Sequence, residues 1–357
     1  MKIHRFFTVF FLCVMLLTAA APSAAASEIL ESRDVDAKAA LLVDPETDEV
    51  LYEENIHEAL YPASLTKIMT CMLVLEAIDN GTLTMDQMIT ASEYAISSVP
   101  DGSSTADLYA GETLSVEDLL YCIMVVSGND AANILAEAVS GPVSAFVDAM
   151  NAKAVELGCE NTHFVNPHGL HDEDHYTTAR DLYVITKAAM EYEDFMTIAD
   201  TRSFTLPATE FHDERTLYTT NYLLSPYRAS GYVYPGAAGI KTGTTTPAGN
   251  CLISTATKND RTLLGIILGA ERVELEDGNV RVTSFTQMAD LFDWGFDNFS
   301  RQTILSSKEL VDELAVSLSE TTHIVVQPAY DVERLLPDDV AVEDLDRTIS
   351  NADYPDG

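Results

Sequence analysis

The spacing of hydrophobic positions changes twice along the chain and predicts strands at both ends of a helical middle. Residues 39–43 and 49–52 are short apolar runs on either side of a polar Pro-Glu-Thr-Asp turn, so they predict a strand hairpin. Apolar residues then recur at the three- and four-residue spacing of helices. The segments with this spacing are residues 64–78, a segment that opens at Ser115 in a capping-box sequence, and residues 129–139, 143–157 and 178–199.

A second group of strands follows the helical middle. Residues 239–244, 251–257 and 262–268 predict three strands, and the polar turn at 258–261 predicts that the last two form an antiparallel hairpin. Residues 282–296 predict a helix that packs back on them. The expected fold class is therefore mixed α/β (α+β), with one sheet built from distant segments and a helical region inserted between them.

The first 26 residues predict a secretory signal peptide. Lys2 and Arg5 form a cationic start, residues 6–17 are an apolar run, and Ala24-Ala25-Ala26 supplies the small residues of a cleavage site. This order of segments is typical of exported proteins, and the apolar run is shorter than the ~20 residues that a membrane span needs. We therefore expect cleavage near Ala26 and a protein that works outside the cytoplasm, in the cell envelope.

Residues 27–300 are expected to form the main domain, and residues 301–357 the start of a small β-rich C-terminal domain that need not be complete. The second segment is sparse in apolar positions, and membrane attachment is not visible in it because it contains no run of span length. The whole chain has 57 Asp and Glu against 20 Lys and Arg, a formal net charge of −37. This charge argues against nucleic-acid binding and against docking on anionic lipid.

Four cysteines follow the signal peptide: Cys71, Cys122, Cys159 and Cys251. In an exported protein they could pair in three ways. Their mostly apolar neighbours, and a domain too large to need cross-links, favour buried free thiols instead.

Ser64 and Lys67 begin the first predicted helix and are the first candidates for chemistry. Residues three apart share a face of a helix, so the Lys67 amine is expected beside the Ser64 hydroxyl. A lysine whose pKa is lowered by burial or by positive potential can take a serine's proton and make it a nucleophile. Alone the motif is weak evidence, because a serine three before a lysine is expected about once by chance in a chain of this length.

Two further motifs could complete such a site. Ser127-Gly128-Asn129 lies between two predicted helices, where a hydroxyl could relay protons and an amide could fix a substrate carbonyl. Lys241-Thr242-Gly243-Thr244 lies on a predicted strand that could bind an anionic group and a peptide backbone. Each has an ordinary structural alternative, a helix cap for the first and an exposed edge strand for the second.

The three motifs occur once each, in the order Ser-x-x-Lys, Ser-x-Asn and Lys-Thr-Gly, which is the set typical of penicillin-recognising enzymes. Over about residues 30–300 the chain resembles the low-molecular-mass penicillin-binding proteins, which are serine-type D-alanyl-D-alanine carboxypeptidases. The segments that carry the resemblance are residues 63–70, 127–132, 166–170, 175–181, 239–245 and 294–296.

The resemblance implies a penicillin-recognising transpeptidase/β-lactamase-like fold and a site that uses neither cofactor nor metal. Carried over by position, Ser64 is the nucleophile, Lys67 its base, and Ser127 and Asn129 the second catalytic element. The main-chain N–H groups of Ser64 and Thr244 are implied to form the oxyanion hole.

The resemblance also implies the residues that bind substrate. These are Lys241, Thr242, Gly243 and Thr244, and a downstream arginine for the terminal carboxylate of the substrate, for which Arg281 is the nearest candidate. Some members of the family carry histidine after Lys-Thr-Gly, where this chain has Thr244. Arg281 is a few residues further from the Trp-Gly-Phe motif than the family pattern has it.

The implied function is removal of the terminal D-alanine from peptidoglycan stem peptides through an acyl-enzyme, with β-lactams such as penicillin as inhibitors. The alternatives are a β-lactamase, a transpeptidase or a D,D-endopeptidase on the same site, or a non-catalytic peptidoglycan-binding or sensor protein. No Glu-x-x-x-Asn motif follows Ser-x-Asn, which disfavours a class A β-lactamase, and three intact motifs disfavour a silent protein. No Gly-x-Ser-x-Gly elbow marks a serine-histidine-acid hydrolase.

A histidine-rich segment could suggest a metal site. His168, His171 and His175 lie close together along the chain, but they follow no tight ligand spacing, and the segment belongs to the metal-free resemblance. A solvated loop is therefore expected there.

Overall fold

The chain, described here by a computed structural model, divides into two compact units, and each is treated by itself. The larger unit is Asp34–Phe299, and the described residues from Ser300 onward belong to the other. The described residues are 34–275, 280–315 and 323–346. The predicted signal peptide, residues 1–26, lies outside them. Among the described residues, no helix is long and apolar enough to cross a membrane.

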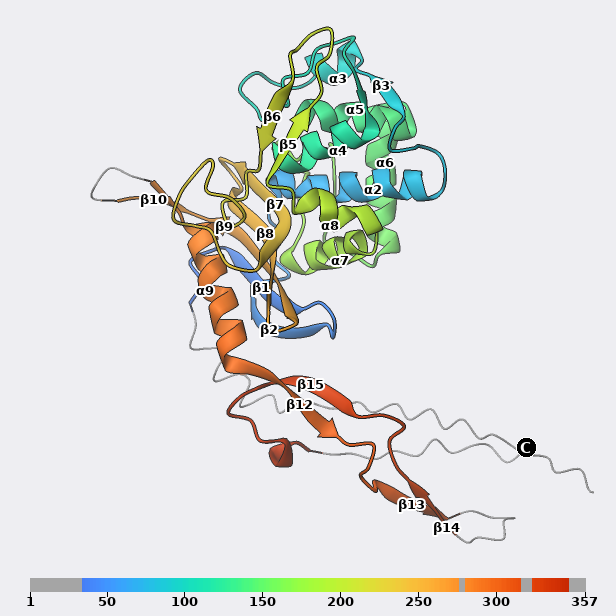
Figure 1. Ribbon diagram of the computed structural model, residues 1–357, viewed down its shortest axis with the longest axis vertical. Helices are drawn as coiled ribbons and strands as arrows, with labels where there is room; N and C mark the ends of the chain where they lie inside the picture. Colours follow the sequence, from blue (N-terminus) through green and yellow to red (C-terminus); the bar gives the residue numbers. More distant parts are fainter. Residues whose placement is uncertain (1–33, 276–279, 316–322, 347–357) are drawn as a thin grey trace, which may run out of the picture. The chain divides into compact units, whose positions relative to one another are not determined.

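A five-stranded antiparallel sheet organises the larger unit (Figure 1). Its strands are β1 Ala39–Asp44, β2 Glu49–Glu54, β7 Ala237–Thr245, β8 Gly249–Lys258 and β9 Arg261–Ala270. Their order in the sheet is β2-β1-β9-β8-β7. The N-terminal hairpin thus pairs with strands from the far end of the domain, through β1 and β9. This confirms the prediction of one sheet built from distant segments.

A helical region is inserted between β2 and β7, as predicted. Its helices are α2 Lys67–Asp79, α3 Glu93–Ser97, α4 Val116–Val125, α5 Asn129–Ser140, α6 Val143–Glu156, α7 Ala179–Met190 and α8 Glu193–Ala199. Ser115 is the N-cap of α4 and forms the predicted capping box with Asp118. Short strands accompany these helices: β3 Met88–Thr90 pairs with β4 Thr113–Ser115, and β5 Ser203–Leu206 with β6 Arg215–Tyr218.

The single helix predicted over residues 178–199 is two helices, α7 and α8, so its predicted length was wrong. Tyr192 has an extended backbone between them, with φ −81° and ψ 127°. Glu193 and Asp194 lie in the first turn of α8, where the positive end of the helix dipole stabilises their negative charges. Ile185 in α7 and Phe195 in α8 are both buried, so the apolar pattern continues across a break that it does not reveal.

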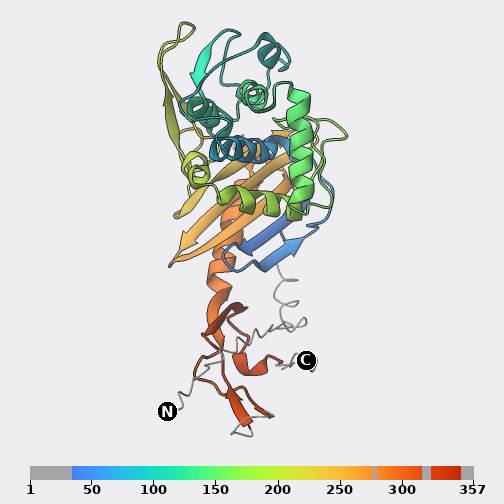
Figure 2. The same ribbon diagram turned by 90° about the vertical axis from the view of Figure 1, so that its right-hand side faces the viewer.

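The sheet is covered by helices on both faces because its strands alternate between two apolar layers. Leu41 and Val43 of β1 belong to the large core that the helical region shares. Leu42 points to the opposite face of the sheet, toward α9 (Thr283–Asn298). A Cβ added at Gly295 of α9 would lie 2.6 Å from Cδ2 of Leu42, so the helix packs closely on this face. Figures 1 and 2 show α9 on one face of the sheet and α7 and α8 on the other. The predicted helix at 282–296 is thereby confirmed.

Three further strand pairs lie outside the five-stranded sheet in the described residues. In the larger unit, β10 Arg272–Glu274 pairs with β11 Val280–Val282. The second unit begins within β12 Phe299–Leu305, which pairs with β15 Val332–Pro337. In its described part, β13 Asp312–Ala315 pairs with β14 His323–Val326, and the 3-10 turn η2 Val342–Asp344 follows β15. The strand predicted at residues 323–326 is therefore present.

The four cysteines of the described chain are free, as predicted. Cys71, Cys122 and Cys251 are buried, and Cys159 is partly exposed. Burial raises the pKa of the Cys251 thiol to about 11 and that of Cys159 to about 12. At neutral pH these thiols are protonated, and a protonated thiol is a poor nucleophile and a poor metal ligand.

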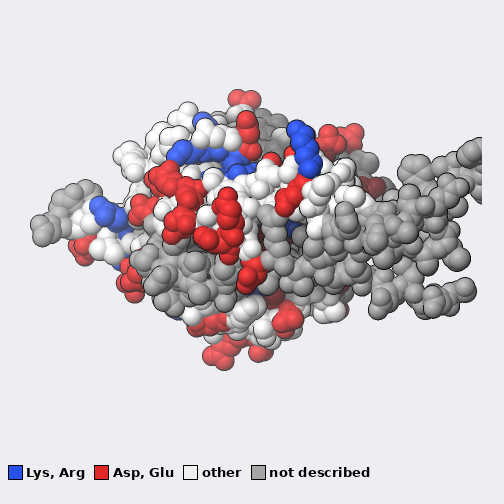
Figure 3. All heavy atoms as spheres, turned by 90° about the horizontal axis from the view of Figure 1, so that it is seen from below, with Lys and Arg blue, Asp and Glu red and all other residues white. Residues whose placement is uncertain are grey.

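The described surface shows the charge imbalance of the sequence. In Figure 3, Asp and Glu side chains are spread over much of the described part of the face, with Lys and Arg at few places among them. Such a surface would repel a phosphate backbone rather than bind it.

Candidate active site

Ser64 and Lys67 are brought together by a tight turn at the start of α2. Ser64 lies in the 3-10 turn η1 (Ala63–Thr66), and Lys67 is the first residue of α2, so the helix predicted from residue 64 begins as a tighter turn. A 3-10 turn has three residues, which places side chains three apart directly above one another. Lys67 Nζ is 3.1 Å from Ser64 Oγ.

The Lys67 amine is buried among hydrogen-bond acceptors. Its Nζ donates to Asn129 Oδ1 at 2.6 Å and to the main-chain oxygen of His168 at 2.7 Å. Burial, and then the charge of Lys241, hold the Lys67 pKa well below its usual range. A neutral amine has two N–H groups and one lone pair. Asn129 and His168 use both N–H groups, which leaves the lone pair for the Ser64 hydroxyl proton.

The Ser127–Asn129 motif links α4 to α5 and faces Ser64. Ser127 has a left-handed backbone with φ 65°, which is uncommon for a residue with a side chain and is typical of functional turns. Its Oγ is buried and has no hydrogen-bond partner among the described residues. A buried hydroxyl without a partner is costly, and a substrate atom could satisfy it. Asn129 is the first residue of α5 and is 2% exposed.

The Lys-Thr-Gly motif lies on β7, an edge strand of the sheet that runs beside η1. A Cβ at Gly243 would lie 2.9 Å from Pro62 O and 3.0 Å from Ser64 N, so glycine lets the strand approach the nucleophile's turn this closely. Lys241 is 1% exposed, and burial lowers its pKa to about 7. Thr242 Oγ1 lies 2.6 Å from Thr220 Oγ1, which fixes its direction.

The three motifs meet at one pocket of about 220 Å³. Of the residues expected at the site, Ser64, Ser127, Thr242, Gly243 and Thr244 line this pocket. Lys67, Asn129 and Lys241 are buried residues of the same motifs, outside the lining. The lining residues that sequence reasoning missed are Ser104, Thr220, Tyr222, Asn250, Cys251, Arg272, Val282, Ser284 and Phe285. They come from loops and element ends that carry no motif of their own.

The arginine expected from the resemblance, Arg281, is exposed on β11 and is not among the residues that line the pocket. Arg281 pairs with Val273, and the neighbouring pair is Arg272 with Val282. Successive residues of a strand point to opposite faces, and both Arg272 and Val282 line the pocket. The register therefore turns Arg281 away and Arg272 toward the pocket, where Arg272 Nε donates to Asn250 Oδ1 at 3.1 Å.

The histidine-rich segment supports the nucleophile's turn from behind. The expectation of a solvated loop was wrong for His168 and His175, which are 8% and 2% exposed. Val165 N–H donates to His175 Nδ1, so Nε2 carries the proton and donates to Thr66 Oγ1 at 2.8 Å. Burial lowers the pKa of His175 to about 4 and that of His168 to about 3, so both are neutral at pH 7.

No group of three or more His, Cys, Asp or Glu side chains in the described part of the chain is arranged to hold a metal ion. His168 and His175 instead use their ring nitrogens within the protein: His168 Nδ1 accepts from Leu170 N–H at 3.2 Å. The groups gathered at the pocket are hydroxyls and amines, which are suited to acyl transfer through a serine.

Comparison with known proteins agrees with this geometry. The family model described as D-alanyl-D-alanine carboxypeptidase (peptidase S11) matches residues 23–272. D-alanyl-D-alanine carboxypeptidase DacF of Bacillus subtilis is 32% identical over 347 residues, which cover 95% of this chain and 83% of that protein. DacC of Escherichia coli is 34% identical over 289 residues, 79% of this chain and 67% of that protein.

Solved structures show the same fold. Penicillin-binding protein 5 of Haemophilus influenzae superposes with a TM-score of 0.70 at 29% identity and covers 86% of this chain and 84% of its own. The DD-transpeptidase of Streptomyces K15 superposes with a TM-score of 0.65 at 29% identity, over 74% of this chain and 98% of its own. The expected penicillin-recognising fold is thereby confirmed, and the chain belongs to the D-alanyl-D-alanine carboxypeptidase family of serine peptidases.

Proposed function

We propose that the protein removes the terminal D-alanine from peptidoglycan stem peptides, with Ser64 as nucleophile and Lys67 as general base. The observation that carries this proposal is the buried Lys67 amine, 3.1 Å from Ser64 Oγ, with both N–H groups directed to acceptors. Residues 1–26 would act as a signal peptide that delivers the enzyme to the cell envelope, where this substrate lies.

Acylation would begin with attack of Ser64 Oγ on the carbonyl carbon between the two D-alanines. Lys67 takes the Ser64 proton as the new C–O bond forms. The carbonyl oxygen becomes an oxyanion, which the main-chain N–H groups of Ser64 and Thr244 would stabilise. Both residues line the pocket, so these groups are near the position that the carbonyl would occupy.

Release of D-alanine requires a proton on the leaving nitrogen. The Ser127 hydroxyl, which has no partner among the described residues, would donate this proton and recover one from the Lys67 ammonium. The C–N bond breaks, D-alanine departs, and the stem peptide remains as an ester on Ser64. Water then hydrolyses the ester and regenerates the serine. In a β-lactam the ring amide would take the place of the D-Ala–D-Ala bond.

The test is release of D-alanine from diacetyl-Lys-D-Ala-D-Ala by the mature chain, with Ser64→Ala as the inactive control. Release by wild type and none by the variant supports the proposal. Turnover of penicillin without release of D-alanine would favour a β-lactamase. Cleavage of crosslinked dimers alone would favour an endopeptidase, and binding without any turnover would favour a non-catalytic protein.

Penicillin is expected to form a covalent adduct on Ser64 and on no other residue. Ser64 Oγ has the Lys67 amine beside it at 3.1 Å, whereas Ser127 Oγ has no hydrogen-bond partner among the described residues. Peptide mass spectrometry of the labelled protein locates the adduct. An adduct on Ser127 or Cys251, which also line the pocket, would overturn the assignment of the nucleophile.

The carboxylate of the substrate is expected to bind Arg272 rather than Arg281. A charge-assisted hydrogen bond contributes about 1.5–3 kcal/mol, so Arg272→Ala should lower kcat/KM for the peptide acid roughly 10- to 100-fold. The same variant should leave kcat/KM for the corresponding peptide amide nearly unchanged. Arg281→Ala is the matched control from the same strand pair. If Arg281→Ala selectively loses activity on the acid, the original expectation from the family pattern holds.

A further inference from the structure

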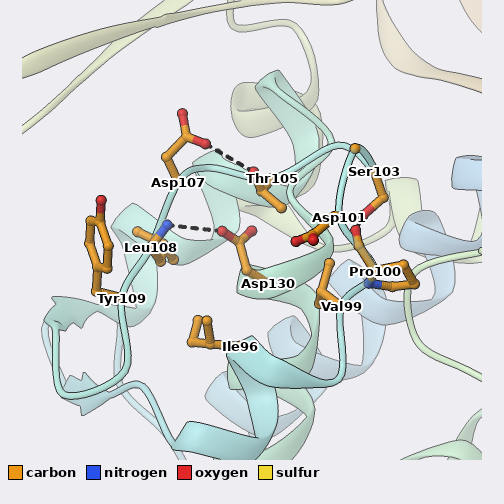
Figure 4. Close-up of a pocket in the computed structure, with 11 residues that line it drawn as sticks. Ile96, Val99, Pro100, Asp101, Ser103, Thr105, Asp107, Leu108, Tyr109 and Asp130 are labelled. Atoms are coloured by element: carbon orange, nitrogen blue, oxygen red, sulfur yellow. Dashed lines mark hydrogen bonds between the residues drawn. The ribbon is translucent and has the colours of Figure 1, made fainter.

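Ser104, which lines the catalytic pocket, begins a segment, residues 104–108, that belongs to no helix or strand. Ser104 lines the catalytic pocket, whereas Ser103 and Thr105 line a second cavity of about 280 Å³ (Figure 4). The segment is therefore a thin partition between two cavities. Asp107 within it has a left-handed backbone with φ 58°, which has to be held by its surroundings.

The carboxylate of Asp130 holds this partition through its main chain. Asp130 is 2% exposed and accepts the N–H of Ala106 on both oxygens, at 3.0 Å each, and the N–H of Leu108 at 3.0 Å. In Figure 4 the carboxylate points toward Leu108, along the line of that hydrogen bond. The N–H of Ala131 also donates to it, at 2.8 Å. The carboxylate thus bridges the partition and the first turn of α5.

The same partition is joined to the catalytic residues. Asn129, which precedes Asp130, donates its main-chain N–H to Ser104 O at 2.9 Å, and its side-chain oxygen accepts from Lys67 Nζ at 2.6 Å. Arg215 of β6 donates to Ala106 O at 2.9 Å from another element. The position of residues 104–108 is therefore set by the same short stretch of α5 that directs the Lys67 amine.

We propose that Asp130 is a positioning residue, which fixes residues 104–108, and with them the pocket residue Ser104, and keeps Asn129 aligned with Lys67. The proposal rests on the proposed function because its kinetic readout is acylation of Ser64. Asp130 makes no hydrogen bond to Ser64 or Lys67, and it holds the segment through main-chain N–H groups. Its negative charge also acts on Lys67, in the direction that raises the Lys67 pKa. Removing that charge alone would favour the neutral base, so slower acylation in a variant without the charge would report on the lost hydrogen bonds.

Asp130→Asn tests the proposal because it conserves shape. Both oxygens of Asp130 accept N–H groups, so in either orientation the amide NH₂ of asparagine would face a main-chain donor. At least one buried N–H would lose its acceptor. We expect the second-order rate of acylation by penicillin to fall at least 10-fold. Amide hydrogen exchange of residues 104–109, followed by mass spectrometry, should rise by a similar factor, while exchange in the central sheet stays unchanged.

Asp107→Asn is the matched control. Asp107 lines the same second cavity, but it is exposed, and its carboxylate accepts from the Thr105 hydroxyl within the segment. Its acylation rate should stay within about 2-fold of wild type. If Asp130→Asn does not fold, Asp130→Glu takes its place, because it keeps the charge and displaces the oxygens by one methylene.

Three results would overturn the proposal: wild-type acylation in the Asp130 variant, wild-type exchange at residues 104–109, or faster exchange throughout the domain with no local excess. The last result would make Asp130 a general stabilising residue. Failure of the wild-type enzyme to be labelled on Ser64 would instead contradict the proposed function. The hydrogen-exchange measurement tests the hydrogen bonds between Asp130 and residues 104–108 directly, whatever the labelling of Ser64 by penicillin shows.

Discussion

Lys67→Arg should reduce the rate at which penicillin acylates Ser64 by about 10²- to 10⁴-fold, the range that general bases contribute. The lysine can act as a base because burial and the nearby charge of Lys241 lower its pKa. A guanidinium stays protonated in proteins and has no lone pair to offer. The variant keeps the positive charge, so a loss reports on proton transfer rather than on charge. Stopped-flow labelling with a fluorescent penicillin measures the rate.

The pH dependence of acylation tests the same role of Lys67. Protonation of Lys67 removes its lone pair, so the wild-type rate should fall as the pH decreases through the lowered Lys67 pKa. Lys153→Arg is the control, because Lys153 is partly buried and pairs with Glu76 at 2.8 Å, away from the described pocket. Near-normal acylation by Lys67→Arg would exclude the general-base role.

The strands of the central sheet and the three motifs could be predicted from the sequence because each has a local signal, whereas the order of the strands in the sheet could not. Strand alternation, the turn at residues 258–261 and the order of the motifs are all written in short stretches of chain. The break at Tyr192 left no such signal, because apolar residues on both sides of it face one core. The 3-10 turn at Ser64 was equally hidden, since a residue pair three apart fits an α-helix and a 3-10 turn alike.

The rest of the pocket depends on contacts between distant segments. Ser104, Thr220 and Asn250 are common polar residues in unremarkable contexts, and only the folded chain places them around Ser64. The direction of the Arg281 side chain depends on the register in which β10 pairs with β11. A shift of one residue in that register would turn the side chain to the opposite face of the strand pair. The buried roles of His168 and His175 likewise depend on the loop packing behind η1.

Gly169→Ala should destabilise the catalytic domain by about 3 kcal/mol or more. Gly169 has φ 86°, and a Cβ there would lie 1.8 Å from Ala63 O and 2.8 Å from Thr66 Oγ1. The left-handed backbone alone costs an alanine roughly 1–2 kcal/mol. The clash adds to this because Ala63 cannot move freely: its carbonyl accepts from Thr66 Oγ1, which also bonds His175. A backbone displaced by overpacking costs typically 1–3 kcal/mol more.

Gly158→Ala separates backbone strain from the clash. Gly158 has φ 80°, but a Cβ there would meet nothing within 4 Å, so only the strain of about 1–2 kcal/mol applies. At roughly 2–4 °C per kcal/mol, thermal unfolding should show Gly169→Ala melting clearly below Gly158→Ala. Folded Gly169→Ala should also acylate slowly, because the residue it displaces, Ala63, directly precedes the nucleophile, whereas Gly158→Ala should acylate normally. Equal melting temperatures and equal acylation rates in the two variants would show that the loop at Gly169 yields without moving the turn that carries Ser64.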